Sequence, residues 1–217
     1  MDKLSNDIPS PVIGHRGIPS LAPENSLEGL HKASELGVGW VEMDVTLNPD
    51  GIAVMSHDPV TGGLGSSPAL PTLAETLQRL NELSTGLNLE IKDHGYPPEL
   101  IVAQVLKVIE QSQVPGDHLL LSSFNSQILA QCLIQAPHLR RGLIAKTLSK
   151  DWQEISVQLN LYSLHPYWKT LTPNLVTEIK RQGLHLYTWT VNDPKAVRIL
   201  WSSGLDGVIT DYPQRFK

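Results

Sequence analysis

Residues 40–58, Trp-Val-Glu-Met-Asp-Val-Thr-Leu-Asn-Pro-Asp-Gly-Ile-Ala-Val-Met-Ser-His-Asp, form the most informative stretch of the sequence. Two segments within it, 40–47 and 52–56, have the composition of strands, and the Pro-Asp-Gly sequence at 49–51 is a strong hairpin signal. The stretch therefore predicts a strand, a tight turn and a short second strand that forms a β-hairpin arm.

Folding the chain about this turn pairs positions whose numbers sum to about 100. Asp44 is then expected beside Ser56, and Glu42 beside His57-Asp58. Because Glu42 and Asp44 are two residues apart, their side chains share one face of the strand. The hairpin therefore predicts two carboxylates and an imidazole at one spot, which is typical of a metal site with an acid or base beside it.

The rest of the chain repeats a short apolar strand followed by an amphipathic helix. With the arm at 52–56 set aside, the predicted strands are 12–14, 40–47, 87–91, 119–124, 141–145, 160–164, 185–191 and 207–210. Eight strand–helix units within 217 residues favour an α/β fold, a closed TIM (β/α)8 barrel, over a doubly wound open sheet. No repeat or linker divides the sequence, so residues 1–217 are expected to form a single domain.

The composition is that of an ordinary globular protein, with 41% hydrophobic and 18% charged residues. The net charge is 17 − 22 = −5 and no basic stripe stands out, so we expect no nucleic-acid partner. The first residues are polar and no apolar run reaches membrane-spanning length, which predicts a cytoplasmic protein without a membrane span. The single cysteine, Cys132, excludes an internal disulfide, and its apolar neighbours predict a buried small hydrophobe.

Three carboxylates fall on strands near the ends that would form the mouth of such a barrel. Glu42 and Asp44 lie on the second strand, and Glu90 lies on the strand at 87–91. Pointing into one mouth they would repel one another, so all three can remain ionised only beside a cation. Oxygen ligands without cysteine suit Mg²⁺ or Ca²⁺ better than zinc. In the alternative, each carboxylate pairs separately with a lysine or arginine at the barrel rim.

Two histidines, His15 and His57, follow the first strand and the hairpin arm. Imidazoles titrate near neutrality, so the two are predicted to be a general acid and a general base. Arg16 and Lys92 place two positive charges at the same mouth, as expected for an anionic substrate such as a phosphate. For Lys92, simple pairing with a neighbouring carboxylate is the alternative. His165, at the end of its predicted segment, is left open between lining the pocket and a structural role.

With these residues in view, the sequence resembles the glycerophosphodiester phosphodiesterase family, whose barrel is of the phosphatidylinositol-phospholipase-C type. The matching stretches occur in family order and span nearly the whole chain. They are Gly14–Gly17, Ala22–Ser26, Val41–Val45, Asp50-Gly51, His57-Asp58, Pro71–Leu73, Leu89–Lys92, Ser122–Phe124, Thr188–Asn192 and Gly207–Pro213.

The resemblance implies metal-dependent hydrolysis of glycerophosphodiesters to sn-glycerol 3-phosphate and an alcohol such as choline, ethanolamine or glycerol. The substrate would be a small molecule, and the cofactor a divalent cation, Mg²⁺ or Ca²⁺. The sequence is compatible with a monomer or a homodimer. The implied roles are acid/base catalysis for His15 and His57, substrate binding for Arg16, Lys92, Phe124 and Trp189, and metal ligation for Glu42, Asp44 and Glu90.

One departure from the family pattern lies between His57-Asp58 and the helix that begins near Pro71. Family members usually carry a long insertion there, whereas only residues 59–70 separate the two motifs in this chain. The insertion is therefore predicted to be shortened or missing, which leaves the mouth more open. A wider mouth makes a lysophospholipase D-like activity on bulkier lysophospholipids the nearest alternative function.

Two alternatives come from other classes. A metal-dependent aldolase or isomerase barrel would use carboxylates and a divalent ion to stabilise an enolate, but two histidines on opposite sides of the cluster fit that chemistry less well. A catalytically silent ligand-binding barrel is disfavoured because the acid, base and ligand positions are all intact.

Overall fold

The computed structural model of the chain describes residues 12–63, 69–83 and 85–216. The strands within these ranges are β1 (Val12–Gly14), β2 (Trp40–Leu47), β3 (Ala53–Met55), β4 (Gly86–Ile91), β5 (Leu119–Ser123), β6 (Arg140–Ala145), β7 (Ser163–Pro166), β8 (His185–Thr188) and β9 (Gly207–Thr210). The α-helices are α1 (Leu27–Glu35), α2 (Leu73–Leu83), α3 (Pro98–Gln111), α4 (Ser126–Gln135), α5 (Trp152–Gln158), α6 (Pro173–Arg181) and α7 (Arg198–Ser202). Short 3-10 helices lie at Gly116–His118, Trp168–Thr170, Pro194–Val197 and Pro213–Phe216.

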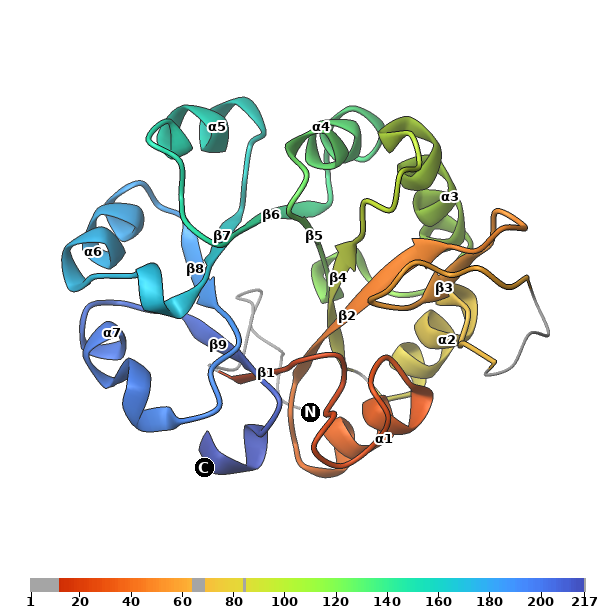
Figure 1. Cartoon of the computed structure of the whole chain (residues 1–217), viewed down its shortest axis with the longest axis horizontal. Coiled ribbons are helices and arrows are strands. Elements are labelled where there is room, and N and C mark those ends of the chain that lie inside the picture. Colours follow the sequence, from red (N-terminus) through yellow and green to blue (C-terminus); the bar gives the residue numbers. More distant parts are fainter. Residues whose placement is uncertain (1–11, 64–68, 84, 217) are drawn as a thin grey trace.

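All strands except β3 form a closed parallel barrel, with the helices in a ring outside it (Figure 1). The barrel closes because β1 pairs with β9 on one side and with β2 on the other. The TIM-barrel prediction is confirmed, and the open doubly wound sheet is wrong. The remaining strand, β3, is antiparallel to β2 and forms the predicted arm.

The hairpin has the register that the turn predicts. Val45 pairs with Met55 and Leu47 with Ala53, so the paired numbers sum to 100. The next position continues the pairing, because the Ser56 amide donates a hydrogen bond to the Asp44 carbonyl at 3.1 Å. The arm therefore carries the chain back past the carboxylates of β2.

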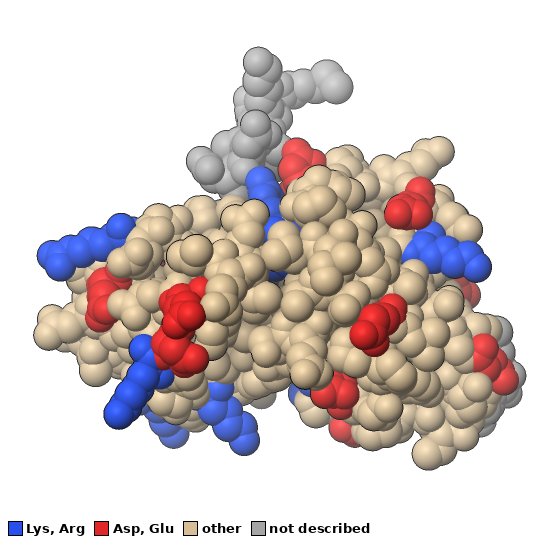
Figure 2. All heavy atoms as spheres, turned by 90° about the horizontal axis from the view of Figure 1, so that it is seen from above, with Lys and Arg blue, Asp and Glu red and all other residues tan. Residues whose placement is uncertain are grey.

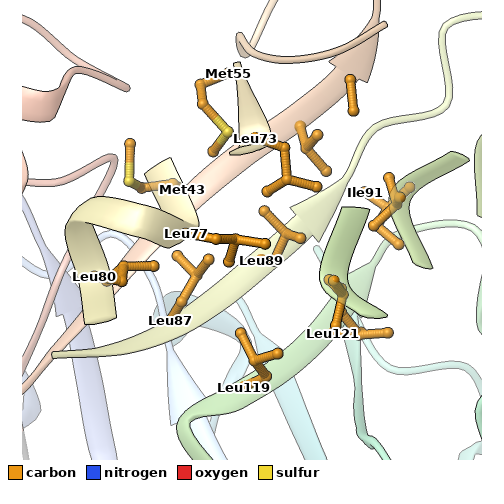
Figure 3. Packing of buried hydrophobic residues seen from close by; sticks show 14 of the residues in the cluster. Met43, Met55, Leu73, Leu77, Leu80, Leu87, Leu89, Ile91, Leu119 and Leu121 are labelled. Carbon is orange, nitrogen blue, oxygen red and sulfur yellow. The ribbon is translucent and has the colours of Figure 1, made fainter. Parts of the chain in front are cut away.

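At the carboxyl ends of β2 and β4, apolar side chains that face the helices alternate with polar side chains that face the barrel axis. On β2 and β4, Met43, Leu87 and Leu89 belong to one buried cluster with Leu73 and Leu77 of α2. Figure 3 shows these side chains packed between the strands and the helix. Burial of one face against the helices fixes which strand residues point inward.

One predicted strand is displaced toward the C-terminus. The segment predicted at 160–164 is a strand only at Ser163–Pro166. Asn160 has a left-handed backbone, with φ 46°, and the Leu161 amide still donates to the Ser156 carbonyl at 2.9 Å. The turn that ends α5 therefore extends into the predicted strand and delays its start.

Two other predicted strands, 119–124 and 185–191, end earlier than expected. As a result Phe124 and Trp189 come directly after β5 and β8 rather than within them. The Trp189 indole N–H donates to the His165 carbonyl at 2.7 Å, which fixes the ring at the end of the barrel.

The expectation for the single cysteine is met. Cys132 is fully buried on α4, and burial raises the pKa of its thiol to about 12, so it is a packing residue. Acidic and basic side chains are interspersed on the face in Figure 2. Among the described residues, no helix combines the length and the apolar character needed to cross a lipid bilayer.

The end of the barrel away from the carboxylates is filled by large side chains from different strands. Ile13, Trp40, Leu120, Tyr187 and Ile209 form one buried cluster there. The indole of Trp40 fits only because its neighbour on β4 is a glycine: a Cβ at that position, 86, would overlap the ring.

We expect Gly86→Ala to lower the free energy of unfolding by about 1–3 kcal/mol, because a methyl group there overpacks the barrel interior against Trp40. The matched control is Gly116→Ala, whose new methyl would approach no atom closer than Leu139 Cδ2 at 3.5 Å. Urea denaturation followed by tryptophan fluorescence compares the two variants. Equal stabilities would contradict this account of the packing.

Candidate active site

All nine residues singled out in the sequence line a single cavity of about 240 Å³ at the carboxyl ends of the barrel strands. They are His15, Arg16, Glu42, Asp44, His57, Glu90, Lys92, Phe124 and Trp189. The barrel thus brings together side chains that lie on β2 and β4 or follow the ends of β1, β3, β4, β5 and β8. His165, left open by the sequence, lines the same cavity.

The three predicted ligands converge. Asp44 on β2 is paired in register with Glu90 on β4, and Glu42 lies one inward-facing position below Asp44. One carboxylate oxygen of each residue lies within 4.8 Å of those of the other two, and all three side chains are buried. Oxygen atoms this close can bind one cation together.

The electrostatics of Glu42 show why a cation fits this cluster. Burial raises the pKa of Glu42 well above its ordinary value, and the neighbouring carboxylates Asp44 and Glu90 raise it further. Its Oε2 accepts a hydrogen bond from the Arg16 amide at 3.0 Å, whereas its buried Oε1 has no hydrogen-bond partner among the described residues. A divalent cation would supply the missing positive partner and keep the cluster ionised.

Two cationic side chains border the cluster. Lys92 Nζ lies 2.7 Å from Glu90 Oε1 and 3.5 Å from Asp44 Oδ1. Arg16 Nε lies 3.4 Å from Asp44 Oδ2. The pairing of Lys92 with Glu90 that the sequence offered as an alternative is therefore present. The carboxylates are not, however, paired separately at the rim, because they share one buried position and both cations contact Asp44.

His15 is held at the mouth by groups from the other end of the chain. Its amide donates to the carbonyl of Thr210 at 2.9 Å, and its Nδ1 lies 2.6 Å from Asp211 Oδ1. Asn192 donates to the second Asp211 oxygen at 2.7 Å. Burial acts to raise the pKa of Asp211, but hydrogen bonds from His15 and Asn192 outweigh it and hold that pKa below its ordinary value. The imidazole Nε2 then faces the cluster, 3.9 Å from Glu42 Oε2.

His57 approaches the cavity from the arm and has the same kind of partner. Its Nδ1 lies 2.8 Å from Asp58 Oδ1, and that contact lowers the pKa of the Asp58 carboxyl. The His57 side chain is 37% exposed, whereas that of His15 is 20% exposed. Two imidazoles, each oriented by an aspartate, therefore lie in one cavity with the carboxylates.

Asn25 is a site residue whose role the sequence did not predict. Its Nδ2 donates to Asp44 Oδ2 at 3.0 Å, and its Oδ1 accepts from the Asp44 amide at 2.9 Å. Asn25 and Arg16 both have positive φ, 53° and 48°, and the Asn25 amide donates to the Arg16 carbonyl at 2.9 Å. The loop after β1 thus uses two left-handed residues to hold one carboxylate in place. Asn25 lies in the stretch 22–26 that resembles the family, and this resemblance could have indicated that Asn25 belongs to the site.

Further cavity residues were also missed. Asn88 lies on the same inward face of β4 as Glu90, and strand alternation could have found it. Lys146, directly after β6, is exposed at the rim. An aromatic pair also lines the cavity, with Phe124 edge-on to Trp189 at a ring distance of 5.5 Å and the Phe124 ring 5.9 Å from Lys92 Nζ. The cavity lining is therefore both ionic and aromatic.

Comparison with known proteins identifies the family of the chain. The profile of the glycerophosphoryl diester phosphodiesterase family matches residues 15–67 and 64–215. The glycerophosphodiester phosphodiesterase of Caldanaerobacter subterraneus subsp. tengcongensis is 30% identical over an alignment of 231 positions, which covers 94% of both chains. A phosphodiesterase from Oleispira antarctica, solved with the product sn-glycerol-3-phosphate, is 32% identical, with a TM-score of 0.87 and coverage of 95% of this chain and 94% of that one. A glycerophosphodiester phosphodiesterase from Parabacteroides distasonis is 26% identical, with a TM-score of 0.82 and coverage of 94% and 93%.

The two segments of the profile match meet at residues 64–67, inside the 59–70 loop where the family insertion was predicted to be short or missing. Part of this loop, 64–68, lies outside the described residues. The match extends over nearly all of the remaining chain, and the identity to the Caldanaerobacter enzyme covers almost its full length. The chain belongs to the glycerophosphoryl diester phosphodiesterase family, a family of phosphoric diester hydrolases.

Proposed function

We propose that this phosphodiesterase hydrolyses glycerophosphodiesters to sn-glycerol 3-phosphate and an alcohol such as choline, ethanolamine or glycerol, with residues 1–217 acting as one domain. Mg²⁺ or Ca²⁺ would be held by Glu42, Asp44 and Glu90. The observation that carries the proposal is the meeting of this buried cluster with His15 and His57 in one cavity. The relatives named above act on or bind glycerol phosphates, which favours this substrate class over lysophospholipids.

The substrate is a phosphodiester anion, so the site must first hold a negative phosphate beside three carboxylates. Arg16 and Lys92 supply fixed positive charge next to the cluster and would bind the phosphate oxygens by charge-assisted hydrogen bonds. When bound, the divalent cation supplies Lewis-acid stabilisation of the charge that develops on the phosphate oxygens. Phe124 and Trp189, which also line the cavity, would exclude water from the bound substrate.

The two histidines would move the protons. With Nδ1–H of each ring donated to its aspartate, Nε2 carries the lone pair and is free to accept a proton. One imidazole would remove the proton of the nucleophile, and the other, protonated, would donate to the oxygen of the leaving alcohol. The nucleophile is either water or the 2-hydroxyl of the substrate, and trapping of a cyclic phosphate distinguishes the two.

Replacement of either His15 or His57 by alanine is expected to lower kcat for glycerophosphocholine by about 10²–10⁴-fold, because each removes one proton-transfer group. The exposed His138 provides a matched control, and His138→Ala should retain full activity. Circular dichroism verifies that all three variants are folded. Activity near that of the wild type in the His15 or the His57 variant would remove the assigned role.

Asp211→Asn is expected to lower kcat by roughly 10²-fold or more, because the amide no longer fixes the His15 tautomer that leaves Nε2 unprotonated. KM should change little if the carboxylate acts only through the imidazole. Asp151→Asn, at an exposed position that does not line the cavity, directly before α5, is the control. A large rise in KM with unchanged kcat would contradict an orienting role.

Removal of divalent cations with a chelator is expected to abolish hydrolysis and to lower Tm, because the buried carboxylates then repel one another. Addition of Mg²⁺ and of Ca²⁺ separately shows which ion restores both properties. In Glu90→Gln the rise in Tm on adding the ion should be much smaller, whereas Glu154→Gln, an exposed change on α5, should respond like the wild type. An unchanged Tm and undiminished activity in chelator would refute the metal site.

A further inference from the structure

Asn88 and His165 line the cavity but have no role in the proposed reaction, and Ser122 is paired in register with Glu90 next to them. All three residues are completely buried. Among the described residues, none offers a hydrogen-bond partner to Oδ1 and Nδ2 of Asn88, Oγ of Ser122 or Nδ1 of His165. A buried polar group without a partner costs about 1–3 kcal/mol, so three such residues at one place need a common explanation.

The strand pairing places these side chains around the barrel axis at neighbouring levels. Asn88 is in register with Glu42, one inward-facing position below Glu90, and Ser122 is in register with Glu90. Ser122 is also in register with Gly142, where an added Cβ would lie 2.7 Å from His165 Nε2. The missing side chain at Gly142 thus leaves space for the His165 ring to reach the interior. Asn88 and His165 both line the cavity, so we call these two residues the polar floor.

The polar floor carries hydrogen-bonding groups but no charge. Burial lowers the pKa of His165 to about 3, so its imidazole is neutral at physiological pH. Its Nε2 is 2.8 Å from Ser163 Oγ, and the ring stands edge-on to Tyr187 at 5.3 Å, which leaves Nδ1 for another partner. An amide and a neutral imidazole together offer both donors and acceptors, which suits a hydroxyl group rather than a phosphate or an ammonium group.

We propose that Asn88 and His165 bind the free primary hydroxyl of the glycerol unit and so select substrates in which that hydroxyl is unmodified. This inference rests on the proposed function and adds the direction in which the substrate enters. The glycerol unit lies innermost, the phosphate lies beside Glu42, Asp44 and Glu90, and the leaving alcohol faces the mouth.

The walls of the cavity agree with this orientation. The inner end is closed by buried residues, with Ile144 and Ile209 5% and 2% exposed beside the polar floor. At the outer end Phe124 is 46% exposed and Lys146 is exposed. A large or variable alcohol therefore fits at the mouth, whereas an acyl chain on the glycerol hydroxyl would have to enter the closed end.

The test compares sn-glycero-3-phosphocholine with the analogue built on propane-1,2-diol, which lacks only the primary hydroxyl and retains the 2-hydroxyl. We expect the wild type to prefer the glycerol substrate in kcat/KM by about tenfold or more, the value of one or two hydrogen bonds. In Asn88→Ala and in His165→Phe this preference should fall toward one, because activity on the glycerol substrate decreases while activity on the analogue does not. Asn88→Ser keeps a smaller polar group and should retain part of the preference. Asn81→Ala, an exposed change on α2, is the control and should retain all of it.

Binding without turnover provides the second measurement. Calorimetry with the metal-loaded protein compares sn-glycerol 3-phosphate with propane-1,2-diol 1-phosphate, and the wild type should bind the former about tenfold more tightly. Failure to hydrolyse either diester, with this binding preference intact, would reject the proposed function but not the polar floor. Equal affinity of the wild type for the two phosphates would mean that the polar floor holds ordered water only. An equal decrease of kcat/KM on both diesters in the Asn88 and His165 variants would mean that these residues have a structural role. Either result overturns the proposal.

Discussion

Mutual repulsion among Glu42, Asp44 and Glu90 is the constraint on which the rest of the site depends. Three carboxylates buried within 4.8 Å of one another cannot all remain ionised without nearby positive charge. The surrounding structure is arranged to keep them there: Asn25 holds Asp44 with two hydrogen bonds, and Lys92 contacts two of the three. A site that must be rigid, charged and buried needs walls that do not move, and the closed barrel supplies them.

The sequence predicted those parts of the fold that depend on local periodicity and on turn chemistry. The hairpin register and the inward face of β2 followed from a turn signal and an alternation of period two, which is why Glu42 and Asp44 were placed correctly. The strand at 160–164 was misplaced because the left-handed backbone of Asn160 is not encoded in the apolar pattern of its neighbours. The local sequence pattern therefore predicted the type of each element and the face of a strand that points inward, but not the start and end of every strand.

The partners of the site residues required tertiary structure. Asp211 orients His15 across 196 positions of sequence, and only closure of the barrel between β1 and β9 brings the two together. Asn25 reaches Asp44 from a loop whose conformation depends on two residues of positive φ. Asn88 of the polar floor was missed, and His165 was left open, for another reason: neutral side chains in a strand resemble ordinary variation until their burial is known.

The β2–β3 hairpin carries two of the proposed metal ligands and one of the proposed proton-transfer groups, because Glu42 and Asp44 lie on β2 and His57 follows β3. In the barrel sheet β3 is hydrogen-bonded only to β2, and outside the sheet the arm is joined to the start of α2 by the Met55 amide, which donates to the Pro71 carbonyl at 2.8 Å. The arm is nevertheless part of the core, because all three residues of β3 are buried and Ala53 and Met55 belong to the apolar cluster that packs against the helices. A segment with this much buried apolar contact opens only when the core opens. On heating, His57 should therefore leave the cavity together with the cooperative melting of the barrel and not before it.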